Sequence, residues 1–97
     1  MLEKYEVPYE YEPEVWIDGQ LYHLDFKLIR PRDGRVMYCE HFGRNDKANY
    51  RRQTANKIAA YAENGIVLWD NLIATFDDEN GNIDVEQIER VFKAFVL

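Results

Sequence analysis

Two acidic residues lie in β-rich segments that the intervening turn would align. Asp25 stands in the run Gln20–Arg30 and Glu40 in the run Arg35–Phe42, and Pro31-Arg32-Asp33-Gly34 between them has the composition of a four-residue turn. In a hairpin closed by that turn, Asp25 is opposite Glu40. Directly opposed residues share a face of the sheet, with Cβ atoms about 4.5–5.5 Å apart. The two carboxylates are therefore expected side by side.

A second turn adds a third acid to this row. Asp18-Gly19 is a strong signal for a two-residue hairpin loop, and it aligns Glu12 with Asp25. Like charges so placed destabilise a sheet unless something neutralises them. Mg²⁺ does this with one or two carboxylates, water and phosphate oxygens. The spacing predicts a Mg²⁺ (or Mn²⁺) site at Asp25, Glu40 and Glu12, with Glu10 on the same strand face as the alternative third carboxylate.

The residues around Asp25 alternate between polar and apolar, as they do in a half-buried strand. Its own face also carries His23 and Lys27, and the other face is apolar. The apolar residues are Tyr22, Leu24, Phe26 and Leu28. The alternative interpretation is that Asp25 and Glu40 pair with bases on a solvated face, namely Lys27, Arg30 or Arg35.

The runs that carry these acids form the first part of an α/β fold. Residues 7–17, 20–30 and 35–42 predict a three-stranded antiparallel meander. A helix, a strand at about residues 71–76 and a last helix follow, which completes the order β-β-β-α-β-α. With ninety-seven residues the chain is expected to be a single domain, residues 1–97.

Turn and capping residues set the expected ends of the helices. Asn45 or Asp46 is the expected cap of the first helix, and Gly65 ends it after about Asn64. Asp84 and Gln87 have the spacing of a capping box for the last helix. The first helix has a small apolar face (Ala55, Ile58, Ala59, Ala62) and another face with Tyr50, Gln53, Lys57 and Tyr61. The last helix has a buried stripe of Val85, Ile88, Val91, Phe92 and Phe95.

Composition indicates a globular chain without a membrane span. Apolar residues are 46% and aromatic residues 14% of the chain, which is enough for a packed interior. No apolar run approaches the roughly 18 residues that span a bilayer, and the start lacks the features of a secretory signal. The lone Cys39 has apolar neighbours that favour an inert buried thiol. These features favour a cytoplasmic protein with no membrane partner.

The net charge of −6 conceals an uneven distribution. Residues 27–57 hold nine bases and only three acids, while the flanking segments are strongly acidic. Such a basic middle could face phosphates, and a solvated hairpin tip with an exposed helix face is the alternative. The expected phosphate contacts are Arg44, Lys47, Arg51 and Arg52.

Four short motifs in order resemble the PD-(D/E)XK, or restriction-endonuclease-like, nuclease superfamily. They are Tyr9-Glu10 or Tyr11-Glu12, then Leu24-Asp25-Phe26, then Glu40-His41-Phe42-Gly43, then Tyr50 and Lys57. The chain is most similar to variants that read Glu-His-x-Gly, and the resemblance covers about residues 9–76. It implies a Mg²⁺-dependent phosphodiesterase acting on DNA, with Asp25 and Glu40 as metal ligands.

The chain departs from the family pattern at three places. Leu24 replaces the usual proline, and Phe42 replaces the lysine two residues after the glutamate. In some members that lysine lies on the following helix, which makes Lys57 the matching residue here, with Gln53 one turn earlier resembling a helix glutamine of the exonuclease-like branch. The usual first helix before the strands is missing, so the fold implied is a restriction-endonuclease-like core lacking that helix.

The histidines have weaker assignments. His41 follows Glu40 and so points to the opposite strand face, where either a hydrogen-bonded core histidine or a group that supports the ligands fits. His23 shares a face with Asp25 and is expected to be exposed.

The sequence therefore predicts a small metal-dependent DNA nuclease, or the nuclease module of a repair, replication or mobile-element system. Asp25, Glu40, Lys57 and Gln53 would be its catalytic residues. The alternative is a non-catalytic DNA-binding or subunit-assembly module of the same fold. A third interpretation is an acidic protein-interaction domain. The sheet face left open by the missing helix is compatible with a homodimer, or with a chain that is part of a larger protein.

Overall fold

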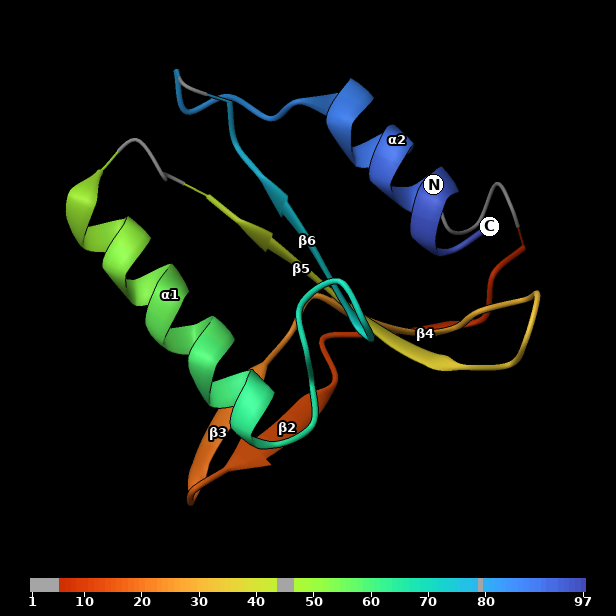
Figure 1. Ribbon diagram of the computed structural model, residues 1–97, viewed down its shortest axis with the longest axis horizontal. Coiled ribbons are helices and arrows are strands. Elements are labelled where there is room, and N and C mark those ends of the chain that lie inside the picture. The colour runs from red at the N-terminus through yellow and green to blue at the C-terminus, as the bar shows by residue number, and fades with distance from the viewer. Residues whose placement is uncertain (1–5, 44–46, 79) are drawn as a thin grey trace.

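The computed structural model describes residues 6–43, 47–78 and 80–97. Over these residues the protein is a mixed α/β fold with six strands in two sheets and two helices (Figure 1). The elements are β1 (Tyr9–Tyr11), β2 (Glu14–Ile17), β3 (Gln20–His23), β4 (Phe26–Ile29), β5 (Val36–Phe42), α1 (Ala48–Glu63), β6 (Leu72–Phe76) and α2 (Val85–Phe95). Neither helix, over the residues described, is long and apolar enough to cross a membrane.

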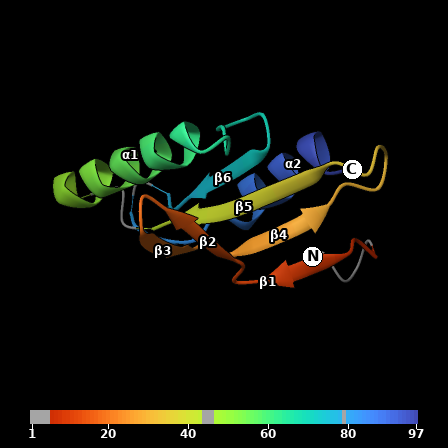
Figure 2. The same cartoon turned by 90° about the horizontal axis from the view of Figure 1, so that it is seen from below.

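The main sheet has the strand order β1-β4-β5-β6, and the strands lie side by side in this order (Figure 2). β4 is antiparallel to both β1 and β5, whereas β6 is parallel to β5. β2 and β3 form a separate two-stranded antiparallel sheet. Because β5 and β6 run in the same direction, the chain must cross over between them, and α1 makes that crossover.

Both predicted turns are confirmed by the register. Glu14 pairs with His23 and Ile17 with Gln20, as a loop of Asp18-Gly19 requires, and both loop residues have the positive φ of a type I′ turn. The second turn is closed by the Arg30 N–H, which donates to the Arg35 carbonyl at 2.8 Å. Phe26 pairs with Cys39 across it.

The first two expected strands are each broken in two, which corrects the prediction of three continuous strands. The first is interrupted at Glu12-Pro13, where Glu12 has a φ of 49° and Pro13 has no N–H to donate to a ladder. The second is interrupted at Leu24-Asp25, between β3 and β4. The predicted single apolar face is wrong for the same reason: Leu24 and Leu28 belong to different cores.

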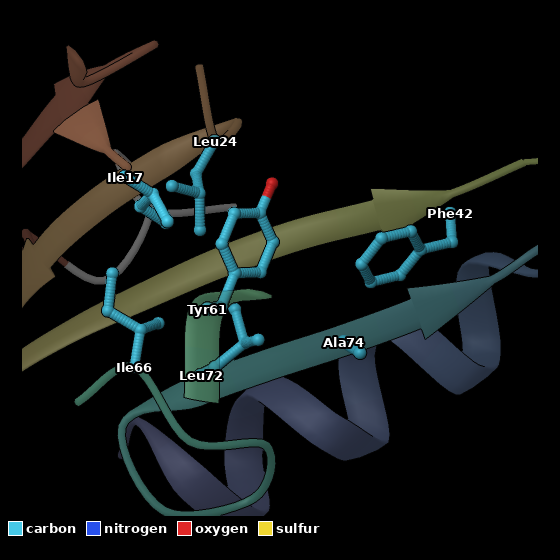
Figure 3. Close-up of a cluster of buried hydrophobic side chains, with 7 residues drawn as sticks. All are labelled: Ile17, Leu24, Phe42, Tyr61, Ile66, Leu72 and Ala74. Atoms are coloured by element: carbon cyan, nitrogen blue, oxygen red, sulfur yellow. The ribbon is translucent and has the colours of Figure 1, made fainter. Parts of the chain in front are cut away.

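Those two cores lie on opposite faces of the main sheet. Adjacent β6 residues divide between them, since Leu72 and Ala74 pack with Tyr61 of α1 while Ile73 packs with Phe92 of α2. The two helices accordingly lie on either side of β5 and β6 (Figure 1). The first core consists of Ile17, Leu24, Phe42, Tyr61, Ile66, Leu72 and Ala74 (Figure 3), and the second of Val7, Leu28, Met37, Ile73, Phe92 and Val96.

The first helix contacts the sheet with residues from both of the faces that the sequence analysis distinguished. Ala55, Ala59 and Ala62 are exposed, whereas Tyr61 is 1% exposed and Ile58 packs beside it. The expected caps Asn45 and Asp46 lie outside the described residues, and the N-cap position is Lys47, which makes no side-chain cap bond. Gly65 follows the helix with a φ of 82°, as predicted for a C-terminal stop.

The last helix starts as predicted but uses Gln87 differently. The Asp84 side chain accepts the Gln87 N–H at 3.0 Å, which is the first half of a capping box. Gln87 does not complete the box, because its side-chain oxygen accepts the Phe76 N–H at 3.1 Å and so links α2 to β6. In the buried stripe, Phe92 is buried and Val85 is 64% exposed, so Val85 was wrongly included.

Candidate metal centre

The Asp25 carboxylate occupies the place where pairing between β4 and β5 ends. The register stops at Phe26 and Cys39, one residue short of Asp25 and Glu40. The next free donor of β5, the His41 N–H, donates to Asp25 Oδ2 at 2.6 Å. A side-chain oxygen thus replaces the main-chain carbonyl that a continuing ladder would offer. The break at Leu24-Asp25 is what brings this side chain to β5.

Glu40 lies beside Asp25 and is almost fully buried. It is 7% exposed, and its Oε2 accepts a hydrogen bond from the Tyr61 hydroxyl at 2.9 Å. Burial, which disfavours the charged form, raises the pKa of Glu40 to about 7. The Tyr61 hydrogen bond and the charge of Lys57 act to lower this pKa, while the neighbouring Asp25 acts to raise it. The two carboxyl groups are therefore close enough to interact directly.

One face of α1 joins Glu40 in a cavity of about 300 Å³. Tyr50, Gln53, Thr54 and Lys57 of α1 line it, and their spacing of three and four residues places them on one side of the helix. The predicted residues Gln53 and Lys57 are thus brought to Glu40. The remaining lining comes from the end of β5 and the residue after it, His41, Phe42 and Gly43.

A larger cavity of about 480 Å³ lies on the α2 face of the sheet. Asp25, Glu40 and His41 line one part of it, and the rest is mainly apolar, with Phe26 and Phe92 among its walls. Glu40 therefore borders cavities on both faces of the sheet. Glu40 can therefore be approached from either side, and Asp25 from the α2 side.

The third predicted carboxylate does not join the pair. Glu12 is exposed and contributes its main-chain N–H to the Asp25 carbonyl at 2.8 Å. Glu10 is exposed too and pairs with Lys27 in the register of β1 and β4. No group of three or more His, Cys, Asp or Glu suited to a metal ion occurs within the described part of the chain. The left-handed turn at Glu12 ends the strand that was expected to present it.

The predicted phosphate-binding residues lie along α1 where the structure describes them. Lys47, Arg51 and Arg52 are exposed at the start of this helix. Arg44 lies outside the described residues. Lys57, on the same helix, connects this basic stretch to the cavity that holds Glu40.

His41 is a hydrogen-bonded histidine on the opposite strand face from Glu40. Its ring contacts two side chains at the C-terminal end of β6: Nδ1 is 2.7 Å from Thr75 Oγ1, and Nε2 is 2.7 Å from Asp77 Oδ1. Gly43 makes room for this contact, because a Cβ at that position would lie 3.1 Å from Asp77 Oδ2. The glycine of the Glu-His-x-Gly motif therefore has a steric reason.

The remaining sequence candidates stay apart from the carboxylates. His23 is exposed and pairs with Glu14 in the hairpin. Burial raises the pKa of the Cys39 thiol to about 12, with Asp25 adding to the effect. A thiol that holds its proton so firmly is a poor nucleophile, which agrees with the inert role expected for Cys39.

Three residues of the site were not singled out for it by sequence. Tyr61, Thr75 and Asp77 each bond to Glu40 or His41. The spacing of Tyr61 from Lys57 placed Tyr61 on the correct helix face. Nothing in the neighbouring sequence predicts its hydrogen bond to Glu40. His41 pairs with Thr75 in the parallel register of β5 and β6, which no turn in the sequence sets, so Thr75 and Asp77 could not be found in the same way.

No known protein family, curated protein or solved structure matches the chain.

Proposed function

We propose that this protein is a metal-dependent DNA nuclease that hydrolyses phosphodiester bonds. The observation that carries the proposal is that Glu40, whose carboxyl group interacts with Asp25, lines one cavity together with Lys57 and Gln53. A carboxylate pair beside an amine and an amide is a suitable donor set for the charges of a phosphodiester and a divalent cation.

The residues present fit a hard cation such as Mg²⁺ or Mn²⁺. Both ligand groups are carboxylates, the donors that Mg²⁺ prefers. Burial and mutual repulsion make the ionised pair unfavourable alone, as the raised pKa of Glu40 indicates. A cation held by both groups would remove that penalty, which supports the assignment of Asp25 and Glu40 as its ligands. When bound, the metal would polarise the phosphoryl oxygens and lower the pKa of a coordinated water.

The chain's own residues supply orientation and charge. Lys57 can place its ammonium against a phosphoryl oxygen or hold the attacking water, and Gln53, one turn earlier, can orient that water through its amide. Tyr61 and the His41 N–H fix the orientation of the two carboxylates. Lys47, Arg51 and Arg52 extend a cationic surface along α1 for the flanking phosphates.

The strand arrangement supports the proposed fold family. A main sheet with one internal antiparallel strand, a parallel pair joined through a helix, and helices on both faces resembles a restriction-endonuclease-like core that lacks its first helix. The carboxylates stand at the edge where β4 and β5 part, on adjacent strands.

The direct test is cleavage of single- and double-stranded DNA with Mg²⁺ or Mn²⁺ by wild type and by Asp25→Asn. Asp18→Asn is the matched control, since it removes the same charge at the hairpin turn, where Asn tolerates a positive φ. We expect metal-dependent cleavage that Asp25→Asn lowers at least about a hundredfold, as removal of a catalytic group does, and that Asp18→Asn preserves. Equal activity in all three proteins would remove Asp25 from the mechanism.

A second candidate is a non-catalytic DNA-binding or assembly module of the same fold. The observation in its favour is Phe42, which stands where the family has a lysine, is 5% exposed and stacks on Phe76 with ring centroids 5.8 Å apart. Salt-sensitive DNA binding without cleavage in either metal would support this module and contradict the nuclease.

A further inference from the structure

We propose that His41 is a positioning residue for the carboxylate pair, acting through its ring contacts to β6. The proposal rests on the nuclease function proposed above and adds the device that holds Asp25 in place. His41 touches the site with its main chain and the neighbouring strand with its side chain.

The end of β5 needs such a device because its pairing is one-sided there. On the β6 side the register continues through Glu40, His41 and Phe42. On the β4 side it stops at Cys39, so main-chain pairing with β4 does not hold the segment that carries the Glu40 ligand and the Asp25-binding N–H. A rotation of this segment would move both groups together.

The ring of His41 restrains that rotation at two points. Thr75 is its register partner on β6, and Asp77 is the first residue after that strand. Nε2 lies against the Asp77 carboxylate, and Nδ1 lies against the Thr75 hydroxyl, which can donate or accept a hydrogen bond. The Asp77 side chain is 10% exposed, and a hydrogen bond to a carboxylate so buried is costly to break. The contact is therefore difficult to release.

The chain of contacts runs from β6 to Asp25 without a gap. Asp77 and Thr75 hold the His41 ring, the ring fixes the His41 backbone, and the His41 N–H orients Asp25 Oδ2. Gly43 permits the approach of Asp77. The spacing of Glu40, His41 and Gly43 in the motif thus has one explanation. Glu40 is the ligand, His41 anchors the strand end to β6, and Gly43 leaves room for Asp77, the partner of His41.

The test compares Thr75→Val with Thr75→Ser. The two variants change the side chain by similar amounts, but only valine removes the hydroxyl that meets Nδ1. Val7→Ala is the stability control, because Val7 is buried in the second core and has no part in the site. The readouts are the proton chemical shift of the His41 amide by NMR, Mn²⁺ affinity by calorimetry, and kcat and KM for DNA cleavage.

We expect the His41 amide proton far downfield in wild type, as for a short bond to a carboxylate, and shifted upfield in Thr75→Val. Mn²⁺ affinity and kcat should fall about tenfold in this variant with KM unchanged, while Thr75→Ser and Val7→Ala stay within about twofold of wild type. Asp77→Asn, which keeps an acceptor for Nε2, should preserve more activity than Asp77→Leu.

Two results would overturn the positioning role. One is an unchanged His41 amide shift in Thr75→Val, and the other is an equal loss of Mn²⁺ affinity in Val7→Ala. If wild type neither binds Mn²⁺ nor cleaves DNA, the nuclease proposal fails instead. The amide shift then still decides whether the Thr75 contact controls the bond to Asp25, with Asp25→Asn as the reference for its loss.

Discussion

The hydrogen bond from Tyr61 to Glu40 should make the stability of the protein depend on pH in a defined way. Tyr61→Phe removes only the hydroxyl that donates to Glu40 Oε2 at 2.9 Å. A hydrogen bond to an ionised group contributes about 1.5–3 kcal/mol, and one between neutral groups about 0.5–1.5 kcal/mol. The variant should therefore lose about 1 kcal/mol when Glu40 is protonated and about 2 kcal/mol when it is ionised.

The sign of the pH dependence follows from the pKa of Glu40. Folding raises this pKa from 4.5 to about 7, so the folded protein holds the proton more firmly than the unfolded chain. The stability from this group is complete below about pH 4.5 and is lost as pH rises through about 7. Loss of the Tyr61 bond should raise the pKa of Glu40 by about one unit more, because 1.36 kcal/mol corresponds to one unit.

The assay is urea unfolding with a chelator present, at pH values from about 5 to about 8.5. Wild type, Tyr61→Phe, Glu40→Gln and the double variant form a cycle, and Tyr38→Phe is the control for removing a tyrosine hydroxyl. We expect coupling between Tyr61 and Glu40 that grows with pH, and a flatter pH profile in Glu40→Gln. A loss in Tyr61→Phe that is equal at every pH, with no coupling to Glu40→Gln, would refute the reasoning.

Two further predictions concern charged residues away from the Asp25–Glu40 pair. Replacing Arg51 and Arg52 together by Ala should weaken DNA binding and reduce the slope of log K against log salt by about 0.9 per lost phosphate contact, measured by fluorescence anisotropy, whereas Arg90→Ala on α2 should leave the slope unchanged. The hydrogen bond from Arg30 lowers the pKa of Asp33 to about 2, so this pair stabilises the fold above pH 4 and the benefit disappears as pH falls through about 2. Asp33→Asn should abolish this loss of stability at acid pH, measured by thermal unfolding. An unchanged loss would contradict the assignment of the effect to Asp33.

The strand register across the two turns was predictable from the sequence because each turn sets it. The Asp18-Gly19 and Pro31–Gly34 loops gave the pairs Glu14 with His23 and Phe26 with Cys39 that the structure contains. A hairpin loop of known length leaves only one alignment. That alignment placed Asp25 near Glu40, although the strand pairing itself stops one residue short of them.

The interruptions of the strands were not predictable in the same way. Pro13 was a visible reason to expect a break in the first run, and nothing comparable marks Leu24-Asp25. There, tertiary packing decides: Leu24 joins the core under α1 and Leu28 joins the core under α2. Alternation in a sequence shows which residues share a face and gives no sign of where a strand twists from one layer to the other.

The burial of α1 shows a related limit. The apolar face of α1 included Ile58 and three alanines, yet the alanines are exposed and only Ile58 of this face packs with the core, together with Tyr61 from the other face. Tyr61 reaches across β5 beside Leu24 (Figure 3), and its hydroxyl meets a carboxylate that is distant in the sequence. Periodicity identifies the faces of a helix, and the partner strand determines which of them is covered.

The β2–β3 hairpin lies outside the main sheet, which makes its tip a site for grafting. Its strands pair only with each other in the described chain, and its tip at Asp18-Gly19 is exposed. Extra residues inserted at the tip in equal numbers on the two strands would lengthen the hairpin. Ile17 and Leu24 would keep their inward direction. A single inserted residue would turn the side chains of one strand to the opposite face. A peptide tag or reporter loop placed there must therefore preserve the two-residue alternation of side chains along each strand.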